Sequence, residues 1–145
     1  MKKRLIFLAA ALLWTAFIWH NSLQPAEVSG EASGSIVELV QPVLDAVGIP
    51  EEQHSFVVRK SAHMTEFAVL ALLWSGCFGQ TVRGVIMAAV LCVGTAGADE
   101  IIQRFVPGRS CEIRDFCIDT LGAGLGIAAA ALVRLCLKKQ KKTNE

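Results

Sequence analysis

One set of imidazole, carboxylate and amide side chains lies at the ends of apolar segments, and these side chains are the candidates for chemistry. They are His63, Glu66, Asp99, Glu100, Gln103, Asp115 and Asp119. Imidazole and carboxylate groups can bind a divalent cation, which could activate water against a phosphodiester or an amide. Without a metal, His63 oriented by Glu66 could act as a general base.

The spacing inside each group predicts that its members share one face of a helix. His63 and Glu66 are three residues apart, and Asp99 and Gln103 are four apart. Side chains at these separations are neighbours on a helix surface. Each pair is therefore predicted to point in one direction.

A stripe of aspartate and glycine runs along the last apolar segment. Asp115, Asp119, Gly122 and Gly126 recur at helical spacing, and the two glycines form a Gly-x-x-x-Gly pair that lets a neighbouring backbone approach closely. Ionisable groups at membrane depth normally face a cavity or a partner. We expect this stripe to pack inward.

Basic side chains accompany the acidic ones. Lys60 lies one turn before His63, and Arg109 and Arg114 follow a Pro107-Gly108 turn. The guanidinium group of Arg109 could fold over the acidic residues or bind an anionic group. We call the following nine candidate site residues the polar layer: Lys60, His63, Glu66, Asp99, Glu100, Gln103, Arg109, Asp115 and Asp119.

The composition indicates an integral membrane protein that is all-α. The chain has 145 residues, of which 53% are hydrophobic and 19% charged, with a mean hydropathy of +0.48. This composition excludes collagen-like, disordered and disulfide-scaffold proteins. A net charge of +1, without a basic stretch that contains aromatic residues, argues against nucleic-acid binding.

Four apolar blocks, 5–19, 67–82, 84–98 and 120–133, are each shorter than the roughly 20 residues that a spanning helix needs. Extending the last three draws the polar layer to the same end of each helix. The prediction is a single domain, a bundle of four transmembrane helices at about 4–21, 60–79, 84–104 and 115–136. The first block could instead be a signal peptide, but no small-x-small cleavage site follows it.

The basic residues favour a topology with both termini inside, because nine Lys and Arg then lie on the cytoplasmic side and five outside. Segment 21–58 becomes an acidic extracytoplasmic loop. Its Gly- and Ser-rich start at 27–35 is predicted to be flexible. Residues 35–47 are amphipathic and predict a short helix that lies on the outer surface or caps the bundle.

No metal or other cofactor is expected, although the residue types would permit a metal. Apart from His63 and the inner Arg83, residues 59–119 contain six acids and five bases, so a bound dication is less necessary. The five cysteines are interpreted mainly as small hydrophobic residues, although Cys111 and Cys117 could approach each other.

Three segments together resemble the VanZ-like family of bacterial membrane proteins. Segment 59–67, RKSAHMTEF, is similar to the family's Lys-x-x-His-x-x-Glu-aromatic pattern. Segment 99–103, DEIIQ, is followed by FVPGR, and the third segment is Asp115, Asp119 and Gly122. Asp119 stands where the family more often has Asn, and Phe67 stands where Tyr is common.

The resemblance implies a multipass protein of the bacterial plasma membrane with a role in resistance to the glycopeptide teicoplanin or in another envelope process. It implies no known reaction. The bilayer is the first expected partner, followed by a lipid-linked cell-wall precursor or a lipid headgroup.

Three interpretations of the polar layer remain open. The favoured one is a non-enzymatic site in the outer leaflet that binds an envelope ligand, with Lys60, Arg109 and Arg114 contacting an anionic group. The second is a hydrolase or transferase, metal-dependent or not, that acts on a lipid-linked substrate. The third is a structural charge network, with the pairs Lys60–Glu66, Arg104–Glu100 and Arg109–Asp115.

Overall fold

This computed structural model describes residues 1–143 of the chain. They contain five α-helices and one short 3₁₀ helix, joined by short connections. No strand occurs within these residues, so the all-α prediction is confirmed. The elements are α1 (Lys2–Ser22), α2 (Ala26–Ala46), η1 (Glu51–Gln53), α3 (His54–Phe78), α4 (Val82–Gln103) and α5 (Ile113–Thr143).

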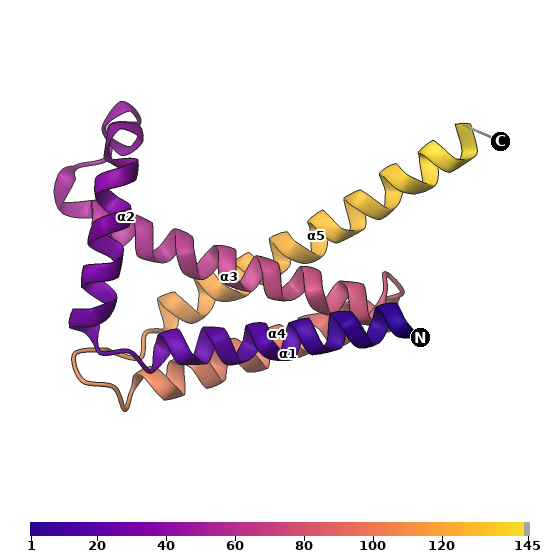
Figure 1. Ribbon diagram of the computed structural model, residues 1–145, viewed down its shortest axis with the longest axis horizontal. Helices are drawn as coiled ribbons and strands as arrows, with labels where there is room; N and C mark the ends of the chain where they lie inside the picture. Colours follow the sequence, from indigo (N-terminus) through magenta and orange to yellow (C-terminus); the bar gives the residue numbers. More distant parts are fainter. Residues whose placement is uncertain (144–145) are drawn as a thin grey trace.

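The helices α1, α3, α4 and α5 alternate in direction, while α2 stands across one end (Figure 1). Helix α3 is central, because it contacts α1, α2, α4 and α5. The far end of α5 diverges from the other helices, and its side chains beyond residue 131 are exposed. The ends at which α1 and α4 finish and α3 and α5 begin therefore meet beside α2 (Figure 1).

The four predicted helices are present, with shifted ends. Helix α3 begins six residues before the predicted position 60, and α5 continues seven residues beyond 136. The turn between α3 and α4 lies at 79–81, and α4 begins two residues before the predicted position 84. Gly79 ends α3 with a φ of 77°, and the Thr81 hydroxyl caps α4 by accepting a bond from the Gly84 amide at 3.1 Å.

Within segment 21–58, the helix predicted at 35–47 is present as part of α2, but the start at 27–35, which we expected to be flexible, is helical as well. Helix α2 begins at Ala26 after Pro25, with Glu27 in its first turn, where a carboxylate favours the positive end of the helix dipole. The Ser33 hydroxyl donates to the Ser29 carbonyl at 2.7 Å instead of breaking the helix. Backbone hydrogen bonding thus outweighs the turn preference of the Gly and Ser residues.

Three helices, rather than the four expected, are long and apolar enough to cross a membrane: α1, α4 and α5. Helix α3 has 25 residues, but its first half contains Arg59, Lys60, His63 and Glu66. Contacts with the other helices bury the side chains of Phe67, Leu70 and Trp74 in the second half of α3.

The outer surface of the bundle is apolar. Large hydrophobic side chains such as Leu13 on α1, Val90 on α4 and Leu132 on α5 are exposed. The interior is filled by smaller groups and a few large ones, including Phe67 and Ile18. Exposed apolar surface on this scale is typical of a face that contacts lipid.

The glycine stripe of α5 packs inward against α3, as the sequence predicted. A Cβ atom at Gly122 would collide with the Met64 carbonyl, and one at Gly126 would collide with the Ala68 carbonyl. The two backbones therefore touch at these positions. This contact places Asp119, one turn before Gly122, beside His63.

All five cysteines are free thiols. Cys111 and Cys117 are both exposed and form no disulfide with each other. Cys92 is buried in the hydrophobic core, in agreement with its interpretation as a small hydrophobic residue.

Candidate functional site

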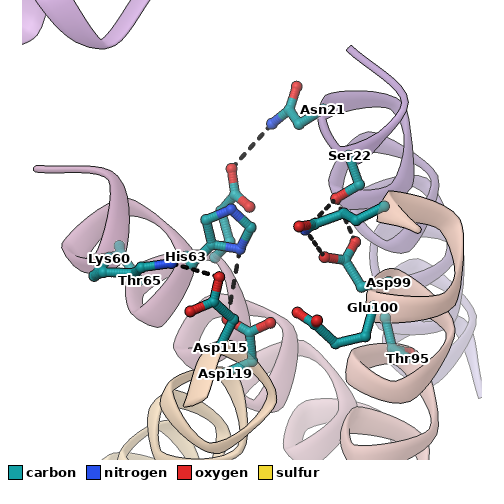
Figure 2. Close-up of polar contacts among 12 residues, drawn as sticks. Asn21, Ser22, Lys60, His63, Thr65, Thr95, Asp99, Glu100, Asp115 and Asp119 are labelled. Carbon is teal, nitrogen blue, oxygen red and sulfur yellow. Dashed lines mark hydrogen bonds and ion pairs between the residues drawn. The ribbon is translucent and has the colours of Figure 1, made fainter. Parts of the chain in front are cut away.

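Three helices each contribute one ionisable side chain to a buried cluster. His63 of α3, Asp99 of α4 and Asp119 of α5 each place a nitrogen or carboxylate oxygen so that these atoms all lie within 4.8 Å of one another. Both aspartates have 0% exposure. Figure 2 shows His63 and Asp119 on one side of this cluster and Asp99 on the other. We call these three residues the buried triad.

Asp99 is held by two hydrogen-bond donors. The Ser22 hydroxyl donates to Oδ1 at 2.5 Å, and the Gln103 amide donates to Oδ2 at 2.8 Å. Asp99 and Gln103 therefore share one helix face, as their spacing predicted. Ser22 was not among the predicted site residues, although it follows the first apolar block at the same end of the bundle as the polar layer.

Asp119 has much weaker support. The His63 Nδ1 atom lies 3.5 Å from Asp119 Oδ1, too far for a good hydrogen bond. Neither carboxylate oxygen of Asp119 has a hydrogen-bond partner within residues 1–143. A fully buried carboxylate without a hydrogen bond is rare, because burial of an unpaired charge is costly.

Glu66 connects α3 to the end of α1 rather than to Lys60. Its Oε1 accepts a hydrogen bond from the Asn21 amide at 3.0 Å, and its backbone carbonyl accepts one from the Trp14 indole at 2.9 Å. Asn21 is a second residue that the sequence analysis missed. The sequence feature that could have identified it is the polar pair Asn21-Ser22, which follows His20 after the apolar block 5–19.

The predicted ion pairs do not form; other pairs take their place. Lys60 pairs with Asp115 across α3 and α5, not with Glu66. Glu100 Oε2 accepts a hydrogen bond from the Glu112 backbone amide at 2.7 Å, not from Arg104. The glutamate thus stabilises the start of α5, where the first backbone amides lack partners within the helix.

Arg109 binds backbone carbonyls instead of Asp115. Its Nε donates to the Gln24 carbonyl at 2.9 Å, and its Nη2 donates to the Asn21 carbonyl at 3.2 Å. Burial lowers the pKa of Arg109 from its ordinary value, while the Asp99 carboxylate acts in the opposite direction. Arg109 thus attaches the loop 104–112 to the end of α1 and to the connection that follows it, where a cation is favoured by the negative end of the helix dipole.

A cavity of about 480 Å³ lies at this end of the bundle, between α2, α3 and the loop that precedes α5. Six members of the polar layer line it: Lys60, His63, Glu66, Gln103, Arg109 and Asp115. Asp99, Glu100 and Asp119 do not. The structure therefore divides the predicted layer into residues that face the cavity and residues that lie outside its lining.

The cavity lining has more basic side chains than the sequence analysis assigned to it. Arg59 joins the three that were predicted, Lys60, Arg109 and Arg114, and the acids in the lining are Glu66, Glu112 and Asp115. Arg59 is exposed, and it forms no hydrogen bond or ion pair with any residue that the structure describes. The cavity thus has one basic group that is not already used in internal contacts.

Long apolar helices with an apolar outer surface and a polar cavity at one end define a helical membrane protein. The model of the VanZ/LLP1 family matches residues 7–134, and the chain belongs to this family. This match confirms the resemblance inferred from the motifs. No curated protein and no solved structure gives a significant match.

Proposed function

We propose that this protein crosses the bacterial plasma membrane four times, as a single domain with both termini in the cytoplasm. Helix α3 is the fourth span, since its 25 residues extend about 37 Å at 1.5 Å per residue. The N-terminus and the turn before Arg83 lie at the same end of the bundle (Figure 1). This arrangement agrees with the positive-inside rule and directs the cavity outward.

We propose further that the outward cavity binds the anionic headgroup of an envelope ligand, such as a lipid-linked cell-wall precursor or a phospholipid. The observation that carries this proposal is the cavity of about 480 Å³ with four basic side chains in its wall. A phosphate oxygen can accept hydrogen bonds from Arg groups in a geometry that favours two bonds at once.

The basic residues have different parts in this proposal. Lys60 and Arg109 already have internal partners, so they mainly hold the cavity walls in place. Arg59 has no such partner and is the best placed to contact a headgroup directly. The structural interpretation therefore applies to Lys60 and Arg109, and the binding interpretation applies to Arg59.

A role in tolerance of teicoplanin follows from the family resemblance. The antibiotic binds cell-wall precursors outside the membrane, which is the side that the cavity faces in the proposed topology. Competition for a precursor headgroup, or altered presentation of it, would connect the site to this phenotype.

The test uses the full-length protein in nanodiscs that contain phosphatidylglycerol or phosphatidylcholine, with native mass spectrometry to count retained lipids. We expect preferential retention of the anionic lipid, weakened by Arg59→Gln. Arg83→Gln at the opposite end is the matched control and should leave retention unchanged. Equal retention of the two lipids, or equal effects of the two variants, would contradict the headgroup proposal.

A second experiment addresses the phenotype in a glycopeptide-sensitive Gram-positive host. The intact protein should raise the teicoplanin concentration that cells tolerate, and Arg59→Gln should reduce this gain at equal membrane abundance. If the intact protein leaves tolerance unchanged, the protein has no part in resistance, while the nanodisc result still decides on headgroup binding.

A further inference from the structure

The buried triad has the donor set of a transition-metal site. It contributes an imidazole nitrogen and carboxylate oxygens, and these atoms come from three helices that converge at one point. His63 Nδ1 and Asp119 Oδ1 are already 3.5 Å apart. Donors about 2.1 Å from a common ion lie roughly 3–4 Å from one another, so binding requires a contraction of about 1 Å.

Within residues 1–143, no lysine or arginine forms an ion pair with either aspartate. Lys60 pairs with Asp115, and Arg109 donates to two backbone carbonyls. Arg114 pairs with Glu112 and Asp115, outside the triad. The numbers of acids and bases are nearly equal over residues 59–119, but they are not matched at the triad, where the one ion pair of the two fully buried carboxylates within residues 1–143 is that of Asp119 with His63.

The hydrogen bonds around the buried triad orient one carboxylate and leave the other free to bind an ion. Asp99 is oriented by Ser22 and Gln103, and such outer partners commonly fix the direction of a metal-binding carboxylate. Both oxygens of Asp119 lack hydrogen-bond partners within residues 1–143. Asp119 thus has free acceptor capacity where the other two donors converge, which an ion would satisfy.

We propose that His63, Asp99 and Asp119 bind a divalent transition-metal ion of the Zn²⁺ or Mn²⁺ class. Ca²⁺ and Mg²⁺ fit less well, because they prefer sets made only of oxygen. The charge of the ion equals that of the two carboxylates. His63 has a side-chain exposure of 24% and lines the cavity, so the ion lies at the cavity wall. This inference does not depend on headgroup binding.

The test begins with full-length protein in detergent, stripped with a chelator and titrated with Zn²⁺ against a fluorescent indicator. We expect a single saturable site in the intact protein. Asp119→Asn and His63→Gln should each weaken binding by more than about tenfold, since each removes a direct ligand. Glu38→Gln is the matched control, because Glu38 is an exposed carboxylate of α2 outside the triad and outside the cavity lining, and this variant should bind Zn²⁺ as the intact protein does.

A second measurement uses only the intact protein, so its result does not depend on whether the variants fold. X-ray absorption of the Zn²⁺ form should show one imidazole together with oxygen ligands and no sulfur. Absence of saturable Zn²⁺ and Mn²⁺ binding, or a ligand shell with several histidines or with sulfur, would overturn the proposal. The two aspartates would then have to be neutralised by protons. Neither result affects the anionic-lipid measurement.

Discussion

The contact between α3 and α5 permits a sharp test, because two glycines two residues apart on α5 have opposite surroundings. A Cβ at Gly122 would collide with the carbonyl of Met64, whereas a Cβ at Gly124 has no atom within 4 Å. Gly122→Ala must therefore push the two helices apart. Gly124→Ala adds the same methyl group without a collision.

The expected difference follows from these surroundings. Both substitutions gain about 0.8–1 kcal/mol of helix propensity, which cancels between them. The collision at Gly122 is with backbone rather than with a flexible side chain, so it carries a cost of about 1–3 kcal/mol, typical of overpacking. Gly122→Ala should thus be less stable than Gly124→Ala by about this amount.

The assay is equilibrium unfolding in mixed micelles with increasing sodium dodecyl sulfate, followed by circular dichroism. The intact protein and both variants are compared at equal detergent concentration. Gly124→Ala should be as stable as the intact protein or slightly more so. Equal stability of the two variants would refute the close approach of α3 and α5, and with it the placement of Asp119 beside His63.

Three further predictions address other contacts. Lys60→Met removes the nearer of the two cations at the Asp115 carboxylate and should lower the free energy of unfolding by about 1–3 kcal/mol, whereas adding Asp115→Leu should restore much of it. No recovery of stability in the double variant would argue against the pair. Arg109→Gln removes bonds to the Asn21 carbonyl at the end of α1 and to the Gln24 carbonyl just after it, so amide hydrogen exchange in the loop 104–112 should increase. Unchanged exchange would contradict the attachment. In intact cells, a variant with only Cys111 should react with a membrane-impermeant maleimide, and one with only Cys136 should react only after permeabilisation; the reverse pattern would invert the proposed topology.

Local spacing was a good guide to which side chains share a helix face. Asp99 and Gln103 are hydrogen-bonded one turn apart, and Gly122 and Gly126 pack on one side of α5. Both results follow from 3.6 residues per turn, a property of the backbone that does not depend on neighbouring helices. The helical state of α2 was less predictable. Gly and Ser have a weak preference for turns over helices, and contacts with the rest of the protein can reverse it.

The partners of the charged residues were not predictable in this way. Lys60 was expected to pair with Glu66 and pairs with Asp115. Arg109 was expected to pair with Asp115 and binds the backbone carbonyls of Asn21 and Gln24. Which groups meet depends on how far each helix is rotated and tilted against the next. These quantities are set by packing contacts between helices and leave no periodic signal in the sequence.

The sequence alone therefore determined an all-α membrane protein of the VanZ-like kind with polar residues gathered at one end, because short apolar blocks must extend into charged segments to cross a bilayer. The tertiary structure alone decided how those residues divide: a cavity with Arg59 in its wall, and a buried triad of His63, Asp99 and Asp119. The physical reason is the contact of α5 with α3 at Gly122, which brings three helices close enough for their side chains to share one site.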